Sequence, residues 1–193
     1  MSPAERPILL ILDIDETLVY AAETRLDRPD DFRVGPYSVY RRPGVQDFLT
    51  ACLKLFEIAV WSSAGADYVD AMVQALFPAE QAPSFVWSRD RCVQRYDPER
   101  LERYFVKDLK KVKRLGFDLN RVLVVDDSSE KVERNYGNAV YVRPYYGDPG
   151  DRELPRLAWY LQSLASTPNV RAIEKRGWRD KVPASTEEIP QKG

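Results

Sequence analysis

Two aspartates directly follow the first apolar segment of the chain. The segment runs from Ile8 to Leu12, and Asp13 and Asp15 come next, two positions apart. A short, continuous apolar run predicts a strand that is buried on both faces of a parallel sheet. Open α/β sheets bind their ligands at the carboxyl ends of such strands, where neighbouring carboxylates repel each other unless a cation or a shared proton holds them. The pattern favours metal-assisted or acid–base chemistry. An isolated pair is most often a solvated turn, and it can also be a divalent-metal site like those of sugar-nucleotide transferases.

Further polar groups follow apolar segments in the same manner. They are Ser62, Lys107 and the pair formed by Asp126 and Asp127. A serine before a helix is most often only a helix cap, and most lysines are solvated. At a strand end, however, a hydroxyl and free backbone N–H groups can also bind an anion. Each residue alone is a weak signal, whereas the ordered set is a strong one.

The order Asp-x-Asp-x-Thr, Ser, Lys, Asp-Asp at successive strand ends resembles the haloacid dehalogenase superfamily of phosphohydrolases. Within it, the chain is similar to the branch that contains the phosphatases of the RNA polymerase II C-terminal domain, the NLI-interacting-factor-like branch. The resemblance covers roughly residues 7 to 165. The segments that carry it are Asp13-Ile-Asp-Glu-Thr-Leu-Val19, Arg42-Pro43-Gly44-Val45, Arg91-Cys92-Val93, Val106-Lys107-Asp108-Leu109, Val124-Val125-Asp126-Asp127-Ser128 and Asn138-Ala139-Val140.

This resemblance implies a phosphatase that hydrolyses phosphomonoesters through an aspartyl-phosphate. Asp13 corresponds to the nucleophile, and Asp15 to the acid that protonates the leaving oxygen and then takes a proton from water. Lys107 and Ser62 would hold the transferring phosphoryl group, and Thr17 would support the first loop.

The resemblance also implies a magnesium ion. Its expected ligands are Asp13, the backbone carbonyl of Asp15 and the carboxylate of Asp127, with Asp126 close by. The family usually carries Asp-Asn where this chain has Asp126 and Asp127. Magnesium accepts either an amide or a carboxylate oxygen, so this departure bears on metal affinity rather than on activity.

Alternating strands and helices predict an α/β fold, a Rossmann-like doubly wound parallel sheet of the haloacid-dehalogenase type. Segment 21–36 reads as a polar connection. We expect strands at 8–12, 37–40, 57–61, 85–87, 92–95, 104–106, 121–125 and 139–142, and helices at 44–55, 66–76, 108–115 and through Leu154, Leu157, Leu161 and Leu164. The gaps 18–44 and 76–107 are too short for a large cap domain. We expect one domain over residues 1–178 and a disordered tail over 179–193.

Composition excludes several classes of enzyme. The 193-residue chain contains no histidine, which rules out Ser-His-Asp and Cys-His catalysis. Neither cysteine has an arginine six positions later, so the loop of a cysteine-based phosphatase is absent. The glycine-rich loops that bind nucleotides are absent as well. Two cysteines do not suggest a disulfide framework, and no signal or membrane segment is evident. We therefore expect a cytoplasmic protein with no membrane association.

The resemblance implies a phosphorylated protein or peptide as the substrate, most simply at serine or threonine, and an uncapped site suits so large a substrate. A polynucleotide 3′ or 5′ end is an alternative, although the net charge of −1 does not favour it. A receiver-type switch is disfavoured because Lys107 precedes Asp126. A non-catalytic binding module is also possible, although this chain keeps both Asp13 and Asp15. The sequence does not indicate an oligomeric state.

Overall fold

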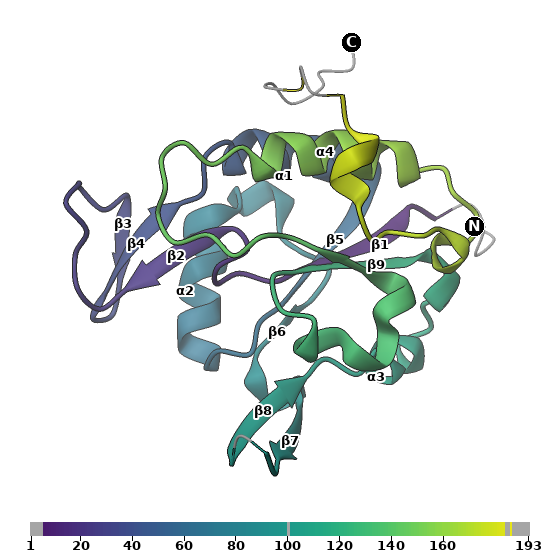
Figure 1. The fold of residues 1–193 in the computed structure, drawn as a ribbon, viewed down its shortest axis with the longest axis horizontal. Coiled ribbons are helices and arrows are strands. Elements are labelled where there is room, and N and C mark those ends of the chain that lie inside the picture. Colours follow the sequence, from purple (N-terminus) through teal and green to yellow (C-terminus); the bar gives the residue numbers. More distant parts are fainter. Residues whose placement is uncertain (1–5, 100, 184–185, 187–193) are drawn as a thin grey trace.

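A five-stranded parallel sheet forms the centre of the computed structural model, which describes residues 6–99, 101–183 and 186 (Figure 1). Its strands, in spatial order, are β10 (Ala139–Tyr141), β9 (Val122–Asp126), β1 (Ile8–Leu12), β5 (Phe56–Trp61) and β6 (Val86–Trp87). Every residue of β1 is buried, as its continuous apolar run predicts. From β1 the chain first adds β5 and β6 on one side and later adds β9 and β10 on the other side, so the order of connection reverses at β1.

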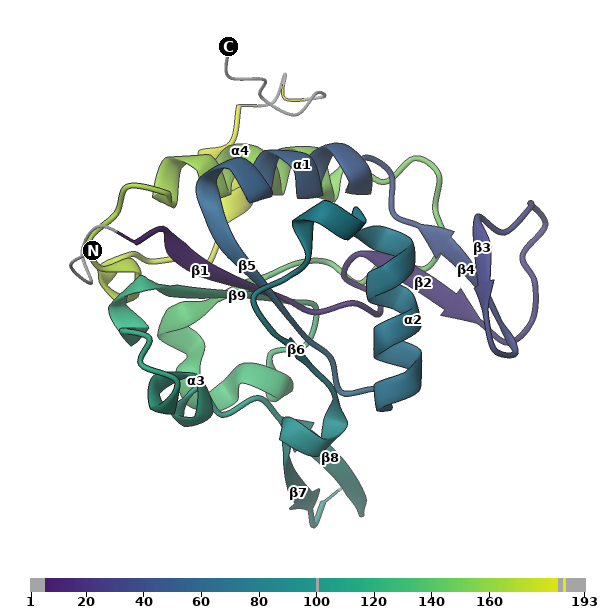
Figure 2. The ribbon, with the colours of Figure 1, turned by 180° about the vertical axis from the view of Figure 1, so that it is seen from behind.

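Helices cover both faces of this sheet, which gives the predicted α/β fold (Figures 1 and 2). Alternate side chains of β1 serve the two faces. Leu10 belongs to the core that includes α1 (Val45–Leu55), α2 (Ala66–Leu76) and α4 (Glu153–Leu164). Ile11 belongs to the core that includes α3 (Lys110–Arg114) and Val132 of the 3₁₀ segment Glu130–Asn138. The two cores fix β1 and its neighbours, and with them the groups at their ends.

The two short gaps hold small antiparallel elements instead of a large cap domain. β2 (Val19–Ala22), β4 (Tyr37–Arg41) and β3 (Phe32–Val34) form a three-stranded sheet. The prediction of a polar connection over 21–36 is therefore wrong, because β3 and the end of β2 lie within it. β2 has four residues and β3 has three, which is too few alternating apolar positions for either strand to be recognised in the sequence.

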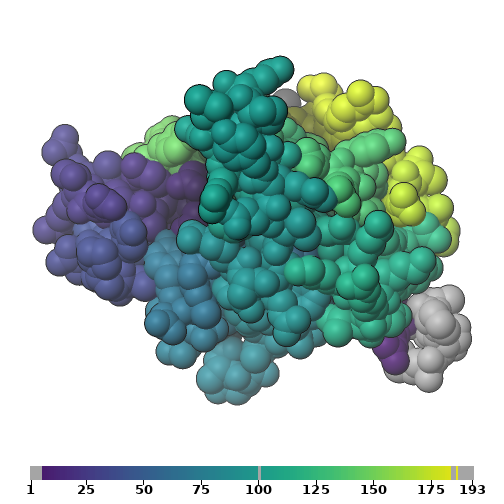
Figure 3. All heavy atoms as spheres, turned by 90° about the horizontal axis from the view of Figure 1, so that it is seen from below, coloured from purple at the N-terminus to yellow at the C-terminus, as the bar shows by residue number. Residues whose placement is uncertain are grey.

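The second gap contains a hairpin formed by β7 (Val93–Asp97) and β8 (Glu102–Val106), where strands were expected at 92–95 and 104–106. Figure 3 views this side of the molecule, where the teal hairpin lies between the purple N-terminal strands and the yellow C-terminal segment. The shorter helical turns are 3₁₀ segments at Ala79–Gln81, Arg89–Arg91, Leu119–Arg121, Val170–Ala172 and Trp178–Lys181.

The folded chain continues past the boundary expected at residue 179. Trp178 is buried, and its indole N–H donates to the carbonyl of Tyr141 at 2.9 Å. Arg179 contacts the buried Glu153, and Val182 is also buried. A disordered tail from residue 179 is thus wrong for 179–182, since a few anchoring side chains outweigh a polar composition. Residues 184, 185 and 187–193 of that expected tail lie outside the described residues. No helix among the described residues is long and apolar enough to cross a membrane.

Candidate active site

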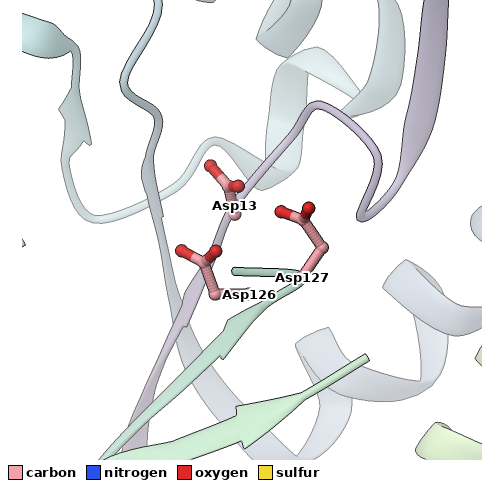
Figure 4. A group of neighbouring side chains, drawn as sticks. All are labelled: Asp13, Asp126 and Asp127. Carbon is pink, nitrogen blue, oxygen red and sulfur yellow. The ribbon is translucent and has the colours of Figure 1, made fainter. Parts of the chain in front are cut away.

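Three carboxylates meet at the carboxyl ends of β1 and β9, two adjacent central strands (Figure 4). Asp13 follows β1, Asp126 ends β9, and Asp127 is the next residue. One oxygen atom from each lies within 4.8 Å of those of the other two. Carboxylate oxygens gathered in this way suit a hard divalent cation, and Mg²⁺ is bound by a small number of them. The residues fit the expected metal, and they lie where doubly wound sheets bind ligands.

Lys107, the residue directly after β8, contacts two of these carboxylates. It is fully buried, and its Nζ lies 2.7 Å from Asp13 Oδ1 and 2.6 Å from Asp126 Oδ2. Burial by itself raises the pKa of Asp13, but Lys107 and Lys131 outweigh it and hold that pKa below its usual range. Burial lowers the pKa of Lys107, and the two aspartates reverse this and raise it. Asp13 is therefore ionised at neutral pH, as a carboxylate nucleophile must be.

A second lysine, Lys131, reaches the same cluster and was not predicted from the sequence. Its Nζ lies 3.1 Å from Asp13 Oδ2 and 3.3 Å from Asp127 Oδ1. Partial burial lowers the pKa of Lys131, but Asp13, Asp126 and Asp127 raise it above its usual range. The four-residue spacing from Asp127 was a local signal, but Asp127 lies before the 3₁₀ segment Glu130–Asn138, and no spacing in the sequence indicates the contact with Asp13.

Asp15 is not one of the three clustered carboxylates, and its side chain contacts Tyr68 instead. Its Oδ1 accepts a hydrogen bond of 2.5 Å from the hydroxyl of Tyr68, which lies on α2. Burial raises the pKa of Asp15, and the bond from Tyr68 opposes that shift without cancelling it. The structure therefore gives the two aspartates of the first motif opposite pKa directions. Tyr68 was also not predicted, because nothing in its spacing from Asp15 indicates contact.

The loop that carries Asp15 is held through its backbone. Glu16 has a left-handed conformation with φ 56°, and its carbonyl accepts from the N–H of Tyr145 at 2.8 Å. The buried Arg42 donates to the carbonyl of Thr17 at 3.1 Å and makes two bonds of 2.8 Å to Asp151. Thr17 is fully buried, and its hydroxyl has no hydrogen-bond partner within the described ranges.

Ser62 follows β5, the strand that pairs with β1, and is buried. Its hydroxyl accepts a hydrogen bond from the N–H of Ala64 at 3.1 Å. The N-cap of α2 is Gly65, so Ser62 is not the helix cap. The structure thus places Ser62 at the same edge of the sheet as Asp13, with its hydroxyl held by its own turn.

A hollow of about 510 Å³ lies next to Ser62, between the start of α2 and the hairpin. Cys92, in its lining, lies 4.0 Å from the carbonyl of Ser62. Arg89, also in the lining, stacks over the ring of Phe105 at 5.0 Å. Cationic and aromatic groups therefore line this hollow.

The sequence and the fold both match known proteins. Residues 8–171 match the family described as NLI interacting factor-like phosphatase. The human carboxy-terminal domain RNA polymerase II polypeptide A small phosphatase 1 is 30% identical over 175 residues, covering 86% of this chain and 62% of that protein. The mitochondrial import inner membrane translocase subunit TIM50 of Kluyveromyces lactis is 28% identical over 173 residues, covering 89% of this chain and 32% of that protein.

Among solved structures, the fission yeast RNA polymerase II CTD phosphatase Fcp1, bound to beryllium fluoride, has the same fold. The TM-score is 0.55 at 19% identity, over 93% of this chain and 51% of that one. The chain spans between 28% and 53% of the length of three further curated relatives. The matched region contains the central sheet and all the candidate site residues.

Proposed function

The chain belongs to the NLI interacting factor-like phosphatase family, and from this we propose that it removes phosphate from phosphoserine or phosphothreonine in proteins, through an aspartyl-phosphate on Asp13. The observation that carries the proposal is the environment of Asp13. This carboxylate is 1% exposed and lies between the ammonium groups of Lys107 and Lys131. An ionised carboxylate at a sheet edge is suited to attack phosphorus.

The proposed reaction has two displacements at phosphorus. In the first, a carboxylate oxygen of Asp13 forms a bond to phosphorus as the ester oxygen leaves and takes a proton from Asp15. In the second, water attacks the same phosphorus and gives its proton to Asp15, and the bond to Asp13 breaks to release phosphate. The raised pKa of Asp15 supports its role as the acid, because it favours the protonated form that the first step needs.

Asp13, Asp126 and Asp127 are the side chains that would hold Mg²⁺. The bound ion would supply positive charge that offsets repulsion between Asp13 and the phosphoryl oxygens. Lys107 supplies fixed positive charge in the same place, since it is fully buried against Asp13 and Asp126.

A phosphorylated protein is the proposed substrate class for two reasons. The name of the human relative refers to the C-terminal domain of RNA polymerase II, which is a protein. The insertions after β1 and α2 are limited to a small sheet and a hairpin, so a bulky substrate can approach. The relatives' names give no support to the alternative of a polynucleotide end.

The test is a panel of phosphoserine, phosphothreonine and phosphotyrosine peptides, 3′- and 5′-phosphorylated oligonucleotides and sugar phosphates. Activity is measured with Mg²⁺ and with excess chelator, for the wild type and for Asp13→Asn. We expect kcat/KM to be highest for the phosphoserine or phosphothreonine peptides, with loss on chelation and in the variant. A preference for a sugar phosphate, or full activity in chelator, would contradict the proposal.

A further inference from the structure

Lys131 brings a second ammonium group to the oxygens that would bind a metal. Its Nζ contacts Asp13 Oδ2 and Asp127 Oδ1 at 3.1 and 3.3 Å, and lies 3.9 Å from Asp126 Oδ1. The other oxygen of Asp13, Oδ1, faces Lys107 instead. Lys131 therefore contacts two of the three carboxylates of the cluster and lies near the third.

The backbone fixes the place from which Lys131 acts. Its carbonyl accepts a hydrogen bond of 2.7 Å from the N–H of Lys107, and the next residue, Val132, is fully buried. The side chains of the two lysines differ, however. That of Lys107 is 0% exposed, whereas that of Lys131 is 21% exposed. A lysine with a flexible stem and access to solvent can leave its partners, and an enclosed one cannot.

Electrostatics makes Lys131 and a divalent cation rivals for the same oxygens. A cation that bridged Asp13 and Asp127 would lie within a few ångströms of the ammonium group, where like charges repel strongly in a partly buried site. From this geometry we propose that Lys131 is a built-in competitor of Mg²⁺, binding Asp13 and Asp127 when the metal is absent and moving toward solvent when the metal binds. This inference rests on the proposed function, whose metal site it concerns.

The first experiment measures Mg²⁺ binding to the full chain by titration calorimetry, without substrate. The variants Lys131→Met and Lys131→Gln remove the charge, and Lys113→Met is the matched control at an exposed position of α3. We expect the Kd for Mg²⁺ to fall by about tenfold or more in both Lys131 variants, because the repulsion is gone. The Kd of the control should equal that of the wild type.

Thermal unfolding provides a readout that is independent of activity. In chelator, Lys131→Met should have a lower Tm than the wild type, since three carboxylates then face Lys107 alone. Saturating Mg²⁺ should raise the Tm of Lys131→Met more than that of the wild type, because the cation replaces the lost charge.

A third measurement needs no variant. Limited acetylation of wild-type lysines, read by mass spectrometry, should label Lys131 faster with saturating Mg²⁺ than with chelator, while labelling of Lys113 stays constant. Equal Mg²⁺ affinity in wild type and Lys131 variants, weaker binding in the variants, or unchanged labelling of Lys131 would overturn this inference and leave the proposed metal dependence in place. Failure of every protein to bind Mg²⁺ would overturn both.

Discussion

At the scale of single residues, the site separates two aspartates that lie only two positions apart. Asp13 is held ionised by two lysines, whereas burial keeps the pKa of Asp15 above its usual range. Two titratable groups whose pKa values are displaced in opposite directions are suited to different roles, one as nucleophile and one as acid. The spacing in the sequence predicted that Asp13 and Asp15 act together. Their different roles follow from the contacts in the structure, which are with Lys131 for Asp13 and with Tyr68 for Asp15.

Asp13→Asn and Asp15→Asn should therefore differ in how they depend on the leaving group. With a phosphoserine peptide, Asp15→Asn should lower kcat/KM by about 100- to 10,000-fold, the usual contribution of a general acid. With an aryl phosphate, whose leaving group needs little protonation, the loss should be much smaller. Asp13→Asn should abolish turnover of both substrates. Near-normal turnover by Asp13→Asn would place the nucleophile elsewhere.

Tyr68→Phe should change the pH profile. The hydroxyl of Tyr68 bonds to Asp15 and lowers its pKa, so its removal should raise that pKa further. Because the acid acts in its protonated form, the alkaline limb of the kcat/KM profile should move to higher pH. A shift of about one pH unit corresponds to one such hydrogen bond. Tyr136→Phe, at an exposed position, is the control, and an unmoved limb would show that Tyr68 does not act through Asp15.

At the scale of elements, the sequence predicted those strands whose apolar runs are continuous and buried on both faces. β1 and β5 end where expected and β9 ends one residue later, which places Asp13, Ser62 and Asp126 at one edge of the sheet. In the first insertion β4 was expected, whereas β2 and β3 were missed, because strands of four and three residues carry too little periodicity. The role of Lys131 could not be predicted, since it depends on contacts between chain segments that are far apart in the sequence.

Arg42→Met should destabilise the protein through the loop after β1. The guanidinium of Arg42 is fully buried and binds Asp151 and the carbonyl of Thr17. Removing one partner of a buried ion pair typically costs about 3–5 kcal/mol, because the other charge is left unpaired. Urea unfolding measures this loss.

Arg33→Met is the matched control for Arg42→Met. Arg33 faces Asp30 at 3.6 Å with its side chain 66% exposed, and a surface pair of this kind contributes about 0–1 kcal/mol. Adding Asp151→Leu to Arg42→Met should recover part of the stability, because no unpaired charge then remains. A loss in Arg42→Met no larger than in Arg33→Met would show that the pair does not anchor the loop.

At the scale of the whole molecule, the C-terminal segment closes the edge of the sheet next to β10. Trp178 stacks on Tyr160 of α4, with ring centroids 5.5 Å apart, and bonds to the carbonyl of Tyr141 in β10. The ammonium group of Lys175 donates to the carbonyls of Val170 and Ile173 at 2.5 and 2.8 Å. The segment around Trp178, at the C-terminal end of the domain, therefore packs against α4 and β10.

Lys175 should make the stability of the whole chain depend on pH in the alkaline range. Burial lowers the pKa of Lys175 to about 8, and Lys181 lowers it too, against the pull of Glu174. The unfolded chain, with the ordinary value of 10.5, binds more protons than the folded chain between these limits, so the free energy of unfolding rises as pH increases from about 8 to 10. Because the two hydrogen bonds to carbonyls favour the charged form and reduce this dependence, we expect a rise of roughly 1–2 kcal/mol. Urea unfolding of wild type and Lys175→Met across this range isolates the contribution, and parallel pH curves for the two proteins would refute it.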